Sequence, residues 1–192
     1  MRVTWIDAAS YAVSRWSGGT TTQLAICPPE ALYADRNFLW RVSSAVVELP
    51  ESDFTPLPDY DRILMILEGE LSLSHDGGEE YILRPLEQTA FDGASRTFSR
   101  GQVTDFNLMM RKDRCTGRVE ARMLDGEKWR GALGQEYESH LLYCVEGEAE
   151  VSFGETAYHI AKGESLLIED AAEDTCVIMG RATVVLAEMK TQ

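Results

Sequence analysis

The strongest constraint on the fold is an internal repeat, in which residues 63–91 resemble residues 141–168. Each copy contains an apolar run, a Glu-Gly-Glu break, a second run, a turn and a third run. In the second run of the first copy, Leu71 and Leu73 alternate with polar residues. Alternation with a period of two is typical of a β-strand that is buried on one face. The repeat therefore predicts two similar units built from short strands.

Short apolar runs separated by turn residues continue along most of the chain, and helical spacing of apolar residues is weak. These patterns predict an all-β protein made of two β-barrels of the double-stranded β-helix or jelly-roll type, related by internal duplication. A charged stretch around Gly117 separates the copies, so we expect an N-terminal barrel at 1–112 and a smaller C-terminal barrel at 113–192. Residues before Ile63 have no counterpart in the second half, and their strands either enlarge the first barrel or are shared with the second.

The chain carries 32 acidic and 18 basic residues, which gives a formal net charge of −14. This charge repels phosphate groups, so we expect neither nucleic acid nor an anionic membrane as a partner. A local basic pocket can still bind an anion. The first 16 residues lack the apolar core of a secretory signal, and no apolar run is long enough to span a bilayer. We therefore expect a cytoplasmic protein whose four scattered cysteines are reduced thiols, and we leave a homodimer open.

A charged residue interrupts the apolar strand predicted at 37–47. Arg41 and Ser43 fall on one face of this strand, while Trp40 and Val42 fall on the other. The strand predicted at 104–111 is divided in the same way, with Asp105 on its polar face. A charge buried among apolar residues costs several kcal/mol unless it is paired or hydrogen-bonded. The two polar faces therefore predict a cluster of hydrogen-bonding groups.

We expect this cluster to form a ligand pocket at the mouth of the first barrel. An arginine can bind a carboxylate with two parallel hydrogen bonds, and an asparagine can both donate and accept. The strand after Gly18 and Gly19 begins with three threonines, so at least one hydroxyl faces each side. The candidate ligand-binding residues are Arg41, Ser43, Asp105, Asn107, one of Thr20 and Thr22, Trp16 as a wall, and Arg62.

Two other arrangements of Arg41 remain open. In one, Arg41 and Asp105 form a buried salt bridge and no ligand is needed. In the other, the face that carries Arg41 is exposed to solvent. The second copy lacks a comparable polar cluster, so we expect a barrel filled by its own side chains.

A metal site is not expected. The chain has three histidines, His75, His140 and His159, and no two of them have the spacing that would place them on one strand face as a ligand pair. We assign no metal, no other cofactor and no catalytic residue.

The repeat unit resembles the core of the cupins, with Gly69 and Pro85 in the first copy and Gly147 and Gly163 in the second at the positions of the cupin motifs. Several segments together are similar to the HutD/Ves family of small bacterial bicupins. They are "WSGGTTTQLA" at 16–25, "FLWRVSSAVV" at 38–47, "DFTPLPDYDRILMILEGE" at 53–70, "FDG" at 91–93 and "DFNLMMR" at 105–111. One departure is Tyr60, which stands where family members commonly have a glycine.

The resemblance implies a bicupin fold and no settled enzymatic activity. It associates the HutD branch with histidine utilisation and with a formylated glutamate-like intermediate, and the Ves branch with the stress response. Three hypotheses of function remain. The first is a non-catalytic regulator or sensor that binds a small anionic metabolite. The second is a metal-independent isomerase or hydrolase, with Asp105 as base and Arg41 as electrostatic stabiliser. The third is a structural or interaction module without a ligand. We rank the enzyme second because a neighbouring arginine lowers the pKa of a carboxylate and weakens it as a base.

Overall fold

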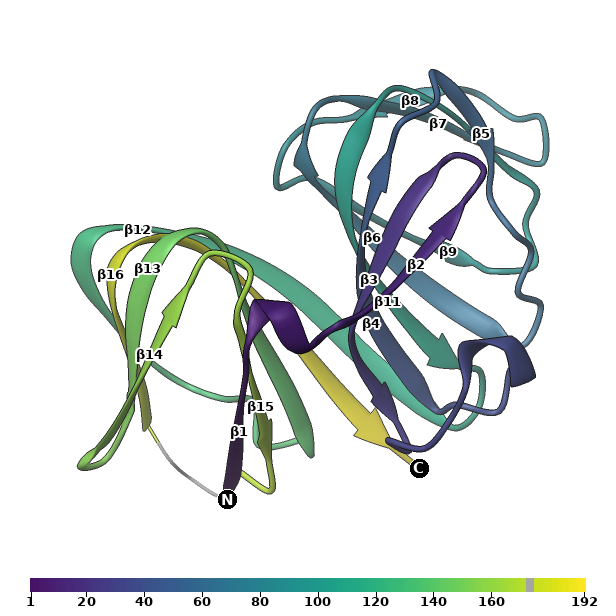
Figure 1. The fold of residues 1–192 in the computed structure, drawn as a ribbon. Coiled ribbons are helices and arrows are strands. Elements are labelled where there is room, and N and C mark those ends of the chain that lie inside the picture. Colours follow the sequence, from purple (N-terminus) through teal and green to yellow (C-terminus); the bar gives the residue numbers. More distant parts are fainter. Residues whose placement is uncertain (172–174) are drawn as a thin grey trace. The chain divides into compact units, whose positions relative to one another are not determined.

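The computed structural model describes residues 1–171 and 175–192, and it divides into two compact units (Figure 1). One unit is Ala12–Cys115, and the other combines Met1–Tyr11 with Thr116–Gln192. The strand pairings of the described residues are antiparallel, and the helical segments among these residues are two 3₁₀ turns, Ala8–Ser10 and Tyr33–Asp35. The predicted all-β class is confirmed. No helix in the described part of the chain is long and apolar enough to cross a membrane.

The unit 12–115 contains two sheets. The larger sheet has the order β2-β3-β4-β11-β6-β9, and the smaller sheet has the order β5-β10-β7-β8. The larger sheet consists of β2 (Ala12–Trp16), β3 (Gly19–Cys27), β4 (Trp40–Val47), β11 (Val103–Arg111), β6 (Tyr60–Glu68) and β9 (Gln88–Asp92). The smaller sheet consists of β5 (Glu51–Asp53), β10 (Thr97–Arg100), β7 (Leu71–His75) and β8 (Tyr81–Leu83).

Alternation along the strands explains how this unit packs. Leu71 and Leu73 of β7 are buried and share one apolar cluster with Leu64 and Ile66 of β6. Residues i and i+2 of a strand share a face, so each strand contributes its apolar set to this cluster. The polar alternation that was predicted for 37–47 and 104–111 occurs on two strands that pair directly, β4 and β11. Their polar residues therefore lie on one continuous surface.

The second unit contains one sheet with the order β1-β15-β13-β16-β12, and β14 pairs with β13. Its strands are β1 (Arg2–Ile6), β15 (Ser165–Glu169), β13 (Ser139–Phe153), β16 (Thr175–Thr191), β12 (Cys115–Ala132) and β14 (Thr156–Ala161). The sequence division at 112/113 placed the N-terminal segment with the first barrel. In the structure, β1 is an edge strand on β15, and the hydroxyl of Tyr11 donates to Oγ of Ser165 over 2.6 Å. These contacts assign residues 1–11 to the unit that contains 116–192.

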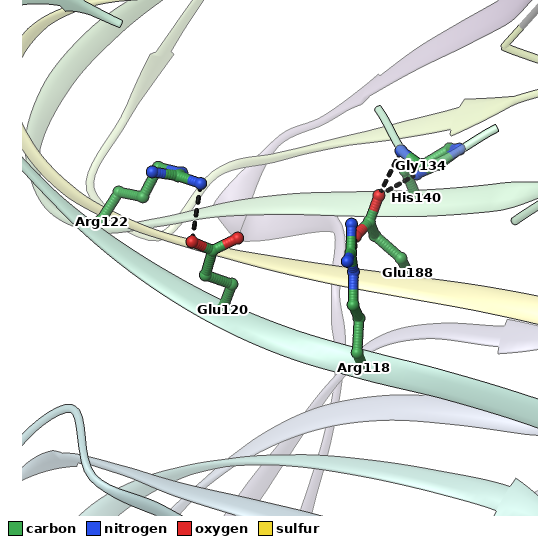
Figure 2. Close-up of polar contacts among 6 residues, drawn as sticks. All are labelled: Arg118, Glu120, Arg122, Gly134, His140 and Glu188. Atoms are coloured by element: carbon green, nitrogen blue, oxygen red, sulfur yellow. Dashed lines mark hydrogen bonds and ion pairs between the residues drawn. The ribbon is translucent and has the colours of Figure 1, made fainter. Parts of the chain in front are cut away.

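The interior of this second unit is filled mainly by apolar side chains, and its described cavity has a volume of about 10 Å³. A buried polar network lies in the same unit (Figure 2). The carboxylate of Glu188, 1% exposed, accepts hydrogen bonds from the backbone of Gly134 over 2.7 Å and from the side chain of Arg118. It also contacts Nδ1 of His140 over 3.2 Å, and His140 is fully buried. Sequence reasoning did not foresee this network, because its members come from three distant segments.

Candidate functional site

The unit 12–115 contains a cavity of about 710 Å³ on the polar face of its larger sheet. This volume is typical of small-molecule sites, which measure about 300–1,000 Å³. Five of the predicted residues line it directly: Arg41, Ser43, Arg62, Asp105 and Asn107. Trp16 lines it as well and is 37% exposed. These five polar residues are at most 6% exposed. The alternative prediction, that the strand face carrying Arg41 is exposed to solvent, is therefore wrong.

Strand register places two arginines on this face, one on each side of Met109. Arg41 of β4 pairs with Met109 of β11, and Met109 pairs with Arg62 of β6. Directly paired residues of an antiparallel sheet point to the same face. With strands about 4.8 Å apart, the Cα atoms of the two arginines are about 10 Å apart. The cavity therefore has two guanidinium groups in one row, and neither sits at the rim.

Arg41 is held by neutral groups. Its Nε donates to Oε1 of Gln23 over 2.9 Å, and its Nη1 donates to Oγ of Ser43 over 3.1 Å. The guanidinium carbon lies 4.4 Å from the centre of the Tyr33 ring, a favourable position for a cation. Burial lowers the pKa of Arg41 from its usual value. No ion pair joins Arg41 to Asp105 within the described residues, so the predicted alternative of a salt bridge between them is wrong.

Arg62 has no such support. No hydrogen bond or ion pair within the described residues involves its guanidinium, and Nε is buried without a partner. Its guanidinium carbon lies 5.0 Å from the ring centre of Phe54 and 5.1 Å from that of Phe91. Burial lowers the pKa of Arg62 to about 10, and the group remains charged at neutral pH. A buried cation without hydrogen-bond acceptors is costly, and an anion in the cavity would relieve that cost.

Asp105 is the buried acid of the cavity. Burial raises the pKa of its carboxyl to about 7, and the charges of Arg62 and Arg41 and a hydrogen bond with the backbone of Ala45 oppose that rise without cancelling it. Its Oδ1 has no hydrogen-bond partner among the described residues. The expectation that a neighbouring arginine would hold the pKa of Asp105 low is therefore wrong, because the loss of hydration outweighs two positive charges that are not in contact with it.

Asn107 lies on β11 between Asp105 and Met109, the residue that separates the two arginines. It pairs with Ser43 of β4, two residues along β11 from Asp105, and it is 5% exposed. Its Oδ1 is buried and accepts no hydrogen bond from a described residue. The cavity therefore presents the unused donors of the Arg62 guanidinium and unused acceptors on Asp105 and Asn107. Unused buried polar groups are uncommon in folded proteins, and several in one cavity indicate a place for a polar ligand.

The prediction that Thr20 or Thr22 lines the cavity is wrong. Thr20 pairs with Val46 and Thr22 with Ser44, on the face opposite Arg41. Thr21 pairs with Ala45 and lines the cavity instead. The cross-strand register that decides this was not available from one sequence.

Sequence reasoning also missed Gln23 and Tyr33, which hold Arg41 from β3 and from the 3₁₀ turn Tyr33–Asp35. The alternation of β3 could have placed Gln23 with Thr21, since i and i+2 share a face. A register shift between Gln23 and Ala25 interrupts that alternation before Ile26. No sequence signal pointed to Tyr33.

The three histidines lie outside the cavity lining. His75 contacts Oγ1 of Thr97 and the hydroxyl of Tyr81, each over 2.8 Å. His140 belongs to the Glu188 network, and His159 is an exposed residue of β14. Within residues 1–171 and 175–192, no group of three or more His, Cys, Asp or Glu side chains is arranged to hold a metal ion.

The HutD family profile matches residues 8–186 of the chain. The chain belongs to the HutD family. Protein Ves of Citrobacter koseri is 32% identical over 122 residues, which are 60% of this chain and 61% of that relative, less than two thirds of its length. Protein Ves of Cronobacter sakazakii is 29% identical over 189 residues, 80% of this chain and 98% of that relative. HutD from Pseudomonas fluorescens is 24% identical, with a TM-score of 0.78 over 100% of both chains, and shows the same fold.

Tyr60 occupies the position at which the family resemblance led us to expect a glycine. Its ring stacks on Phe38 with centroids 4.3 Å apart, and its hydroxyl donates to the backbone oxygen of Phe38 over 3.0 Å. Gly93, in the turn after β9, donates its amide to the backbone oxygen of Tyr60 over 2.8 Å. A Cβ on Gly93 would lie 2.5 Å from that oxygen. The side chain of Tyr60 thus packs in the core while the close backbone approach is made by Gly93.

Proposed function

We propose that this HutD-family protein is a non-catalytic binding protein that holds a small carboxylate in the cavity of residues 12–115 and acts in regulation or sensing. The observation that carries this proposal is Arg62, a buried guanidinium that has no hydrogen-bond acceptor among the described residues. A carboxylate offers two acceptor oxygens in the geometry of the guanidinium fork. The net charge of −14 does not oppose this, because the buried charges of the cavity are two arginines and one acid.

The unused acceptors narrow the chemistry of the ligand. Oδ1 of Asn107 and Oδ1 of Asp105 are buried and unpartnered, so a matching ligand brings an N–H or O–H donor as well as a carboxylate. A formylglutamate-like metabolite of histidine degradation has both, in its carboxylates and its amide N–H. The wall beside these groups contains Tyr33, Phe54 and Met109, which suit the carbon skeleton of such a ligand.

Thermal unfolding with histidine-pathway acids, N-formyl-L-glutamate first, tests the proposal. A ligand at 100 times its dissociation constant adds about 2.7 kcal/mol to the stability of the folded state. For a chain of this size that corresponds to roughly 5–10 °C in Tm. Arg62→Gln removes the fork and is expected to abolish the shift. Arg84→Gln, at an exposed arginine outside the cavity, is the matched control and keeps it. No shift with any acid, for a folded protein, would favour a structural module without a ligand.

A second function is favoured by one observation. The pKa of Asp105 is about 7, close to the value that suits a general base at neutral pH. A metal-independent isomerase or hydrolase would use this carboxylate on a ligand held by Arg62 and Arg41. Proton NMR of the bound acid over several hours would reveal turnover. Loss of turnover in Asp105→Asn, with binding retained, would promote the enzyme over the binding protein.

A further inference from the structure

We infer that carboxylate binding in this cavity is coupled to the uptake of one proton by Asp105. The inference rests on the proposed function, since it concerns the same cavity and the same class of ligand. It adds the protonation state in which the site holds that ligand. No covalent bond forms or breaks, and the proton comes from solvent.

The position of Asp105 gives it no fixed counter-ion. It pairs with Ala45 of β4 and with Ile66 of β6, so its immediate neighbours in the sheet are apolar. It is 5% exposed and its Oδ1 is unpartnered. Arg41 and Arg62, which favour the ionised form of Asp105, pair with Met109, four residues further along β11. Asn107 lies between Asp105 and Met109 on the same face of β11. Asp105 therefore depends on the charges of Arg41 and Arg62 across the cavity, without a contact to either.

The charged and titratable groups around the cavity come from five elements. They are Asp105 on β11, Arg41 on β4, Arg62 on β6, Tyr33 in the 3₁₀ turn, and Glu51 and Asp53 on β5. Glu51 and Asp53 are exposed at the rim, and Glu51 is paired with Arg100 over 2.9 Å. The buried charges are thus two arginines and Asp105.

A bound carboxylate changes this balance in two ways. It occupies Arg62, whose charge is the largest influence that favours ionised Asp105. It also brings a second carboxylate into the same dehydrated space, and two carboxylates in one site raise the pKa of one of them. Because the pKa of Asp105 is already about 7, a further rise protonates it at neutral pH. The protonated carboxyl then has an O–H that can donate to the ligand.

The direction of the pH dependence follows. Below pH 7 Asp105 is mostly protonated before the ligand arrives, so the affinity changes little between pH 6 and 7. Above pH 7 a proton must be taken up, and the affinity falls by at most about ten-fold per pH unit. The carboxylates of N-formyl-L-glutamate are ionised across this range, so the ligand does not supply the dependence.

Titration calorimetry of the full chain with N-formyl-L-glutamate at pH 6, 7, 8 and 9 tests the coupling. At pH 8 the titration is run in Tris and in HEPES, since the difference in heat between the two buffers counts the protons exchanged. We expect net proton uptake, approaching one per ligand. Asp105→Asn is expected to bind without uptake and to show equal affinity at pH 6.5 and 8.5. His75→Gln removes a histidine that interacts electrostatically with Arg62. This variant is expected to take up as many protons on binding as the unmodified chain.

The outcomes separate the two proposals. Binding without proton uptake in the unmodified chain, or with unchanged uptake in Asp105→Asn, would overturn the coupling and leave the binding function standing. Loss of the uptake in His75→Gln would also overturn it. No binding at any of these pH values would overturn the binding function and the coupling with it. If Asp105→Asn does not fold, the two-buffer titration is compared between the unmodified chain and His75→Gln: equal uptake in both supports the coupling, and absent uptake in either overturns it.

Discussion

Nε of Arg41 donates a hydrogen bond to Oε1 of Gln23 over 2.9 Å, so a neutral amide on the adjacent strand holds this buried charge. The acid on the next strand, Asp105, forms no ion pair within the described residues, and its Oδ1 has no hydrogen-bond partner there. Arg41 is thereby fixed in orientation without being neutralised. This arrangement leaves positive charge available in the cavity.

Replacing Gln23 by alanine removes the acceptor for Nε of Arg41. A buried donor left unsatisfied costs about 1–3 kcal/mol, so Gln23→Ala is expected to lower the free energy of unfolding by that amount. Urea denaturation measures it. Gln135→Ala, at an exposed glutamine whose side chain makes no hydrogen bond within the described residues, is the control and is expected to change the free energy by less than about 0.5 kcal/mol. Equal effects in the two variants would show that the bond to Gln23 is not what supports Arg41.

Two adjacent glycines are expected to respond differently to alanine. A Cβ on Gly18 would lie 2.0 Å from the ring of Trp16, and the exposed ring can move away. Gly18→Ala is therefore expected to weaken ligand binding by shifting this wall of the cavity, at a cost in stability below about 1 kcal/mol. A Cβ on Gly19 would lie 1.9 Å from the backbone oxygen of Val46, at a φ of +151°. Gly19→Ala is expected to cost more than about 2 kcal/mol. Thermal unfolding and ligand titration of both variants check the contrast, and the reverse order of stability would contradict it.

Asp105→Asn is expected to stabilise the protein at high pH. The folded-state pKa of Asp105 is raised to about 7, so between about pH 4 and 7 the folded state holds a proton that the unfolded state has released. Stability therefore falls as pH rises through that window, by about 4 kcal/mol for this group. The stability of Asp105→Asn does not fall in this way, because asparagine does not ionise. Urea denaturation at pH 5 and pH 8 measures it, and a difference between variant and unmodified protein that is the same at both pH values would contradict the prediction.

Glu188→Gln is expected to have the opposite pH signature. Hydrogen bonds from His140, Arg118 and Gly134 hold the pKa of Glu188 at about 2, although burial opposes them. A depressed carboxyl pKa contributes stability that is present above about pH 5 and is lost as pH falls toward 2. The contribution is roughly 3 kcal/mol, and the glutamine variant should lose that much at pH 7 and little at pH 2.5. Chemical denaturation at the two pH values measures the difference, which should shrink on acidification.

Local alternation predicted much of this molecule. It gave the all-β class and the shared polar face of Arg41, Ser43, Asp105 and Asn107, because the period of a strand depends only on neighbouring residues. It did not give what depends on pairing between distant strands. Thr21 replaces Thr20 and Thr22 at the cavity through the register of β3 with β4, and Gln23 meets Arg41 through the same register. The raised pKa of Asp105 also lay beyond the sequence, since it follows from how deeply the fold buries that carboxyl.

The central claim is that Arg62 binds a carboxylate in the cavity of residues 12–115. A crystal structure of the protein with saturating N-formyl-L-glutamate tests it most directly. We predict density for the ligand in this cavity, with a carboxylate within hydrogen-bond distance of the Arg62 guanidinium and a donor facing Oδ1 of Asn107. A cavity without ligand, or a ligand bound elsewhere with Arg62 unpartnered, would contradict it.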